Sequence, residues 1–307
     1  TIQFVIFTML SKKRVFLFFS VFLFLLLAIY IMLSLYITSL AIKATRKIPE
    51  SDPSSVNLQY SNQVFYTEDG IRLNGWFIEN TNLETVIIIH GVDANKSDGY
   101  ILDLMKDTFD MGYSVFVFDL RAHGESGGKN LGLAYKERKD LESSIKFLKN
   151  QFNVEKIVIF GISYGGTIAI SNSSLDSSIK GIVVDSPFYD LPELLSSEVS
   201  NRTFIPEFIA KLLKFGIIRS VDLLYEIKTN DIISGIDSVK NFNSPVLLFH
   251  CKDDERIPIS HSNRINKFLP NNSKYIIYDN CDHAKGYEEN TIDFNKHLKD
   301  YYENSFN

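Results

Sequence analysis

The sequence predicts an α/β protein with a mostly parallel sheet wrapped by helices on both faces, preceded by one transmembrane helix. Three observations support this prediction. Short β-branched runs alternate with helical stretches through the middle of the chain. The turn Gly161-Ile162-Ser163-Tyr164-Gly165 joins one such run to a helical stretch. An almost unbroken apolar segment, residues 15–42, lies near the N-terminus.

Length and composition allow one sizeable core and exclude a nucleic-acid-binding surface. The chain has 307 residues, 45% of them hydrophobic, and a formal net charge of -5 that is spread without long runs. Nucleic-acid binding would need a basic face, which this distribution does not provide. Length alone permits one or two domains, and the oligomeric state stays open.

Residues 15–42 are expected to be an uncleaved signal anchor. As a helix the segment would be about 40 Å long, more than the roughly 30 Å of hydrocarbon in a bilayer. A cleaved signal peptide would have a shorter apolar region and a small-x-small exit, and no convincing exit lies near Ala41 or Ala44. The chain is therefore expected to be a single-pass protein of the cell membrane.

Basic residues flank the anchor almost evenly on its two sides. Three precede it and three follow it: Lys12, Lys13, Arg14, Lys43, Arg46 and Lys47. The tight cluster directly before the apolar run favours an N-terminus inside the cell and a globular domain outside. Since the sequence opens without Met, Met9 is a candidate true start of the N-terminal segment 1–14, and residues 1–8 are assigned no function.

The globular part is expected to follow a linker at residues 43–62, because residues 48–57 are rich in Pro, Ser, Asp and Asn. Residues 64–67 and 71–77, joined by Asp69-Gly70, predict a β-hairpin. The alternation that follows predicts strands at 86–89, 114–118, 156–160, 181–184, 245–250 and 274–278, and helices at 99–111, 135–150 and 294–302. A domain at 63–307 is expected.

Ser163 is the candidate nucleophile. An apolar strand pattern precedes it and a helical pattern follows it, which is the context that a Gly-x-Ser-x-Gly turn requires. Strand and helix come so close at such a turn that a Cβ at Gly161 or Gly165 would clash, and the strain exposes the serine. The alternative is a glycine-rich turn whose serine only caps the helix.

Several segments together resemble the α/β-hydrolase superfamily over roughly residues 64–302. They are residues 90–95, 119–128, 161–166 and 245–250, with Asp254, Pro258 and His283. Within the superfamily, the chain is most similar to bacterial membrane-anchored hydrolases of the Bem46-like and serine-aminopeptidase-like kind. It departs from the usual pattern at Cys251 and at Asp282, where those hydrolases usually or often have glycine. The resemblance implies an α/β-hydrolase fold.

The resemblance implies the chain order serine, acid, histidine. A serine needs a base to take its proton, and the base needs an acid to hold its tautomer. Of His261, His283 and His297, only His283 follows a strand within a polar loop, so we interpret it as the base. The acid lies four residues before Pro258 in similar proteins, which selects Asp254. Asp253 is its main rival, and Asp185 and Asp282 are weaker candidates.

Acyl transfer also needs backbone N–H donors aimed at the oxyanion. The N–H of Tyr164 is one candidate, and the resemblance places the second at Val92. The pair His90-Gly91 and the loop that carries Asp119 and His123 are interpreted as structural. This chemistry requires no metal or organic cofactor.

The two cysteines follow the strands expected to carry the acid and the histidine. If those strands are neighbours, Cys251 and Cys281 could form a disulfide outside the membrane, closing a loop of about 30 residues. Two free thiols are the alternative. A metal site using both cysteines would consume His283 and is disfavoured.

Between Pro187 and Pro245 the strand–helix alternation stops, which predicts a helical cap at about residues 188–244. Five apolar residues with helical spacing form a stripe: Ile205, Phe208, Ile209, Leu212 and Leu213. The stripe is expected either to line an acyl pocket or to pack on the sheet domain.

These expectations combine into a membrane-anchored serine hydrolase that cleaves an ester, thioester or amide through an acyl-enzyme. The substrate would be a small molecule, a lipid or a peptide. A carboxylesterase or lipase-like enzyme is favoured, because a neighbouring membrane suits long-chain esters. Since Tyr164-Gly165-Gly166 also resembles serine peptidases, an aminopeptidase stays open. A catalytically silent binding domain is the alternative of another class.

Overall fold

A computed structural model of the chain describes residues 2–307, with side chains from Lys13 onward. Met9, the suggested true start, lies outside the residues whose side chains are described. The chain divides into two compact units. The larger comprises residues 42–194 and 227–307, and the smaller comprises the chain up to Ala41 together with residues 195–226.

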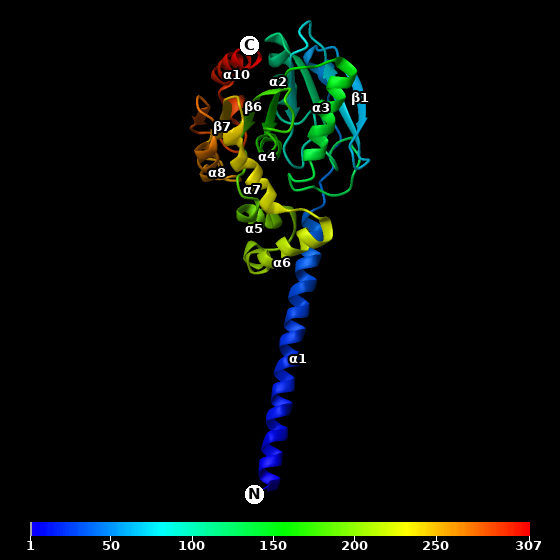
Figure 1. Cartoon of the computed structure of the whole chain (residues 1–307), viewed down its shortest axis with the longest axis vertical. Helices are drawn as coiled ribbons and strands as arrows, with labels where there is room; N and C mark the ends of the chain where they lie inside the picture. Colours follow the sequence, from blue (N-terminus) through cyan, green and yellow to red (C-terminus); the bar gives the residue numbers. More distant parts are fainter. Residues whose placement is uncertain (1) are drawn as a thin grey trace. The chain divides into compact units, whose positions relative to one another are not determined.

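The larger unit is built on one eight-stranded sheet in the order β1-β2-β4-β3-β5-β6-β7-β8 (Figure 1). The hairpin β1–β2 is antiparallel, and β2 also runs antiparallel to β4. The remaining neighbours are parallel, which confirms the predicted mostly parallel sheet. The strands are β1 (Ser61–Tyr66), β2 (Arg72–Ile78), β3 (Thr85–Ile89), β4 (Ser114–Phe118), β5 (Ile157–Ile162), β6 (Ile179–Asp185), β7 (Val246–Cys251) and β8 (Lys274–Tyr278).

Helices cover both faces of the sheet because alternate strand residues point to opposite sides. In β3, Ile87 and Ile89 join the core under one set of helices, and Val86 and Ile88 join the core under the other. The first set is α3 (Arg138–Phe152), α4 (Tyr164–Ser171), α7 (Thr229–Asp237) and α8 (Ser260–Ile265). The second is α2 (Ile101–Asp110), α9 (Gly286–Glu289) and α10 (Thr291–Phe306). Three short 3-10 helices, η1 (Pro53–Val56), η2 (Ser238–Asn241) and η3 (Asn266–Phe268), complete this unit.

The segment predicted as a linker, residues 43–62, is held by specific contacts. Thr45 N donates to Asp93 Oδ1 at 2.9 Å. The Arg46 guanidinium donates to four backbone carbonyls of the loop after β4, those of His123, Gly124, Ser126 and Gly128. One cation therefore satisfies several loop carbonyls that would otherwise need water. Composition could not reveal this, because the partners of Arg46 lie far along the chain.

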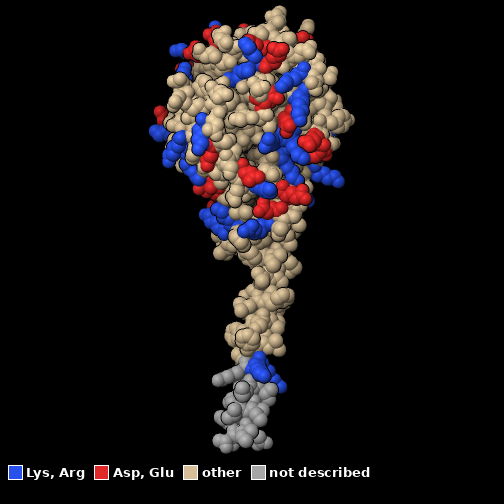
Figure 2. All heavy atoms as spheres, viewed as in Figure 1, with Lys and Arg blue, Asp and Glu red and all other residues tan. Residues whose placement is uncertain are grey.

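The smaller unit consists of α1 (Ile2–Ala41), α6 (Glu207–Tyr225) and the part of α5 (Leu191–Arg202) that follows Leu194. The stretch Lys13–Ala41 has a mean hydropathy of 2.9 and fits a membrane anchor by length and composition. In Figure 2 the visible length of this helix is tan, which means that it carries no charged residues, and blue Lys and Arg atoms lie where the tan atoms meet the grey ones.

The predicted stripe on α6 is only partly buried. Leu213 is buried, but Phe208 is 64% and Leu212 is 72% exposed. Five residues of α6 are buried, of which Ala210, Leu213 and Ile217 pack with Ile37 of α1. The prediction treated the apolar residues as one face, whereas α6 is apolar on two opposite sides.

Candidate active site

Ser163 lies at the turn from β5 to α4 with φ 54° and ψ -113°. A positive φ is uncommon for any residue with a Cβ. The close approach expected at the flanking glycines is confirmed. A Cβ on Gly161 would lie 2.3 Å from the Gly165 carbonyl oxygen, and a Cβ on Gly165 would lie 2.3 Å from that of Ile89. Only glycine permits this turn, which holds Ser163 at the carboxyl end of β5.

Ser163, His283 and Asp254 form one continuous hydrogen-bonded chain. His283 Nε2 lies 2.8 Å from Ser163 Oγ, and His283 Nδ1 lies 2.7 Å from Asp254 Oδ2. An ionised carboxylate can only accept, so Nδ1 carries the proton and Nε2 is left to accept from the serine hydroxyl. The Asp254 carboxylate is fully buried, while 15% of the His283 side chain is exposed. This arrangement can remove the serine proton as the oxygen attacks a carbonyl carbon.

The backbone of its own loop fixes the Asp254 carboxylate. Its Oδ1 accepts from Arg256 N at 3.0 Å and from Ile257 N at 2.7 Å. His250 Nε2 also lies 3.5 Å from Asp254 Oδ2, but burial lowers the pKa of His250. His250 is therefore neutral, and it hydrogen-bonds the Ile257 carbonyl at 2.9 Å. Asp254 is thus oriented toward His283 by two backbone hydrogen bonds from its own loop.

The rival acids are occupied elsewhere. Asp253 is exposed, and its Oδ2 accepts from Asn280 N at 3.1 Å. Asp282 is also exposed, and its Oδ1 accepts from Glu255 N at 3.3 Å. The carboxylate of Asp185 accepts from Tyr100 Oη at 2.6 Å, and burial raises the pKa of Asp185 to about 6.

The end of β6 supports both the serine and the histidine, which sequence reasoning missed. The carbonyl of Asp185 accepts from Ser163 N at 2.7 Å. The hydroxyl of Ser186 donates to Asp185 Oδ1 at 3.0 Å and accepts from Ala284 N at 3.3 Å. Ser186 therefore ties the loop that carries His283 to the strand beside the nucleophile. Its only sequence signal was its position directly after a buried strand.

The loop after β3 runs beside the nucleophile. A Cβ placed on Gly91 would lie 3.5 Å from Ser163 Cβ and 4.0 Å from Ser163 Oγ. Val92 follows Gly91, and Tyr164 follows the serine as the first residue of α4. The loop that leads into Val92 therefore passes in van der Waals contact with the nucleophile.

Two buried histidines hold this loop as hydrogen-bond acceptors. His90 Nε2 accepts from Leu120 N at 3.0 Å, and His123 Nε2 accepts from Asp93 N at 3.2 Å. Burial lowers the pKa of His90, and it lowers the pKa of His123 to about 3. Both rings are therefore neutral, which suits the structural role expected of them.

A buried lysine, which sequence reasoning also missed, ties the same loop to the loop after β4. Lys96 Nζ lies 2.6 Å from Asp119 Oδ2, 2.6 Å from Glu125 Oε2 and 4.6 Å from the centre of the Trp76 ring. The side chains of Lys96 and Asp119 are both fully buried. Removal of Lys96 would leave the buried Asp119 carboxylate without its counter-charge, whereas Lys96 would keep Glu125 if Asp119 were removed.

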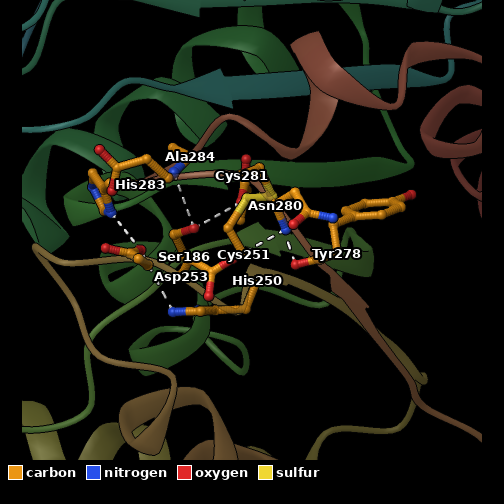
Figure 3. The surroundings of a disulfide bond; sticks show 12 residues. Ser186, His250, Cys251, Asp253, Tyr278, Asn280, Cys281, His283 and Ala284 are labelled. Carbon is orange, nitrogen blue, oxygen red and sulfur yellow. Dashed lines mark hydrogen bonds and ion pairs between the residues drawn. A yellow bond between two sulfur atoms is a disulfide. The ribbon is translucent and has the colours of Figure 1, made fainter.

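A disulfide joins Cys251 and Cys281, with the Cα atoms 5.3 Å apart (Figure 3). The strands β7 and β8 are parallel neighbours, so the loops that follow them start side by side. The first of these loops carries Asp254 and the second carries His283. The disulfide therefore links the loop of the acid to the loop of the base near the point where both loops leave the sheet.

We expect a Cys251→Ala/Cys281→Ala variant to lose about 3–4 kcal/mol of unfolding free energy, because the closed loop spans about 30 residues. Chemical denaturation with intact and reduced protein measures the loss, and Cys281→Ala alone is the matched control with one thiol left free. An intact mass under non-reducing conditions should show two hydrogens fewer than after reduction. Equal stability of the oxidised and reduced proteins would contradict this stabilising role of the disulfide.

Comparisons with known proteins agree on one fold. The family model "Serine aminopeptidase, S33" matches residues 81–215. The Bacillus subtilis protein YqkD is 26% identical over 226 residues, covering 72% of this chain and 71% of YqkD. The Saccharomyces cerevisiae membrane protein YNL320W is 25% identical over 225 residues, covering 73% of each chain. The Pyrococcus furiosus esterase Pf2001 superposes with a TM-score of 0.72 at 23% identity, covering 87% of this chain and 100% of Pf2001.

Proposed function

Because the chain is a member of the α/β-hydrolase superfamily, we propose that it is a membrane-anchored serine hydrolase with Ser163 as nucleophile, His283 as base and Asp254 as acid. The observation that carries the proposal is the unbroken hydrogen-bonded chain from Ser163 Oγ through His283 to Asp254. Two further observations support the proposal. The positive φ of Ser163 is a strained conformation that a serine with only a capping role would not need. The Asp254 carboxylate is buried against His283, as expected of a residue that orients a catalytic base.

In the proposed reaction, Ser163 Oγ attacks the acyl carbonyl carbon while His283 Nε2 takes the hydroxyl proton. The N–H groups of Tyr164 and Val92 stabilise the tetrahedral oxyanion. The intermediate collapses as His283 returns its proton to the leaving group, and the acyl group stays on Ser163. A water molecule then attacks the acyl carbon while His283 takes its proton. The second tetrahedral intermediate collapses, the bond from the acyl carbon to Ser163 Oγ breaks, and His283 returns the proton to Oγ as the carboxylic acid leaves.

Esters are the favoured substrates. The apolar anchor would hold the enzyme at a bilayer, where acyl esters are concentrated, and a protein named as an esterase shares the fold. A serine aminopeptidase is the second candidate, because the family model that matches residues 81–215 carries that description.

The disulfide favours a catalytic unit outside the cytoplasm, since such bridges persist in oxidising compartments. The basic residues Lys13 and Arg14 before the apolar run favour the same orientation. The yeast relative YNL320W is described as a membrane protein, which supports anchoring of this chain.

A substrate panel tests the activity. We expect the full chain in detergent to cleave p-nitrophenyl acyl esters with a kcat/KM at least about 100-fold above that for aminoacyl p-nitroanilides. Faster cleavage of the anilides would show that the chain is a peptidase and not an esterase. Absence of both activities in folded protein would favour the silent binding domain.

A further inference from the structure

We propose that α6 is an interfacial helix whose exposed apolar side lies on the surface of the bilayer that α1 enters. The proposal rests on the membrane anchoring proposed above. It concerns only the smaller unit, and it is independent of the catalytic roles of the larger one.

On the side of α1 that meets α6, exposure falls at Ser34, whereas Tyr36 on another side is still 50% exposed. Between Val15 and Leu33 the large aliphatic, Met and Phe side chains are 44–75% exposed. Ser34, Ile37 and Thr38 are each only 1% exposed. At 1.5 Å per residue, residues 15–33 form a rod of about 28 Å, which matches the about 30 Å of hydrocarbon in a bilayer. The boundary between hydrocarbon and headgroups therefore falls near Ser34.

The helix α6 crosses α1 at this boundary. The backbone N–H of Gly216 donates to Tyr30 Oη at 2.9 Å. Thr38 Oγ1, which donates to the Ser34 carbonyl at 2.8 Å, also lies 3.4 Å from the Ile217 carbonyl. A Cβ on Gly216 would lie 2.2 Å from Ser34 Oγ, so glycine allows the two helices to touch. These contacts set the level of α6 between Tyr30 and Thr38. A tyrosine at that level is typical of a membrane–water interface.

The side of α6 that faces away from α1 carries a row of exposed apolar residues, which we call the outer stripe. Its members on α6 are at helical spacing and are 64–80% exposed: Phe208, Leu212, Phe215 and Leu223. Phe204, which is 76% exposed, lies just before the helix. Soluble proteins rarely expose a contiguous row of large apolar side chains. The outer stripe therefore needs an apolar partner.

The geometry of the unit points to lipid as that partner. The buried residues of α6 pack on Ile37 of α1 and on Val199 of α5. In Figure 1, α6 crosses α1 near its C-terminal end, and the long exposed part of α1 continues on the side away from α5. The outer stripe lies on the side of α6 opposite these packed residues. It is therefore free to contact the bilayer that residues 15–33 of α1 enter.

Basic residues on α6 suit the headgroup region. Lys211 and Arg219 are exposed next to the outer stripe, and the Arg219 guanidinium lies 5.4 Å from the centre of the Phe215 ring. Their surface ion pairs, to Glu207 at 2.9 Å and to Asp222 at 4.0 Å, are of the weak exposed kind that a phosphate can replace. Long basic side chains can lay their methylene stems along apolar surface while their charges reach phosphate. An apolar row flanked by Lys and Arg is typical of helices that lie in the membrane surface.

Depth-dependent fluorescence quenching tests the proposal on the full chain. Since the two native cysteines are bridged, a single added cysteine can be labelled selectively with the NBD fluorophore. The labelled variants are Leu212→Cys in the outer stripe, Leu33→Cys in α1 and Ile292→Cys, a 90% exposed apolar residue of α10 as the matched control. Each is reconstituted in vesicles of phosphatidylcholine with a minority of phosphatidylglycerol, with and without lipid that carries a nitroxide close to the headgroup.

We expect the label at Leu212→Cys to lose at least half as much fluorescence as the label at Leu33→Cys, and the label at Ile292→Cys to lose little. Loss at Leu212→Cys no greater than at Ile292→Cys, with Leu33→Cys quenched, would overturn the interfacial helix alone. Self-quenching at Leu212→Cys without quenching by lipid would mean that a second copy covers the stripe. An unquenched Leu33→Cys would overturn the anchoring itself.

Discussion

Ser163→Ala is expected to lower kcat by about 10⁴-fold to 10⁶-fold and to abolish covalent labelling by a fluorophosphonate probe. The loss is large because alanine has no oxygen to attack the acyl carbon, and the oxyanion donors alone give little rate. The probe phosphonylates only a serine whose proton a neighbouring base removes. Hydrolysis of the best ester and in-gel fluorescence of the full chain measure the two effects.

Ser54→Ala is the matched control, because Ser54 is an exposed serine of η1. That variant should keep its activity and its labelling. Labelling that survives in Ser163→Ala would place the nucleophile elsewhere. If the folded wild-type chain stays unlabelled, a catalytically silent binding domain becomes the favoured interpretation.

The second large effect is expected at the acid. Asp254→Asn should lower kcat by about 10⁴-fold, because an amide that donates to His283 Nδ1 stabilises the wrong tautomer of the ring. The variant should still fold, since the amide oxygen of asparagine can accept from the N–H groups of Arg256 and Ile257 as Oδ1 does now. Steady-state kinetics on the best ester, with circular dichroism as the check on folding, measures the change.

Asp253→Asn is the neighbouring control. Its side chain is exposed, and the carbonyl oxygen of asparagine can still accept from Asn280 N, so activity should stay within about threefold of wild type. A collapse of kcat in Asp253→Asn with an active Asp254→Asn would move the acid to Asp253. Full activity in both variants would point to Asp185, the remaining buried carboxylate near the histidine loop.

Local patterns were enough to predict the sheet and its turns. Short β-branched runs bounded by turn residues are typical of buried strands, and their order with intervening helices implies parallel neighbours. The serine turn was equally readable, because the need for glycine at Gly161 and Gly165 is a matter of contacts within a few residues. The assignment of Asp254 and His283 leaned instead on a family resemblance, since the two are far apart in the chain.

Contacts between distant segments explain what the sequence could not reveal. The bond from Ser186 to Ala284 and the carbonyls bound by Arg46 depend on loops that meet only after the sheet forms. The same holds for the buried pair of Lys96 and Asp119. None of these residues has a local pattern that distinguishes it from an ordinary polar loop residue.

By itself, the sequence determined the α/β architecture, the apolar rod of α1 and the strained turn at Ser163, because each depends on the spacing of apolar residues and glycines within one short segment. Only the tertiary structure decided which carboxylate contacts His283, that Cys251 and Cys281 pair, and which side of α6 is buried. Those outcomes depend on which surfaces the folded chain brings together, and helical spacing alone cannot tell two apolar sides of one helix apart.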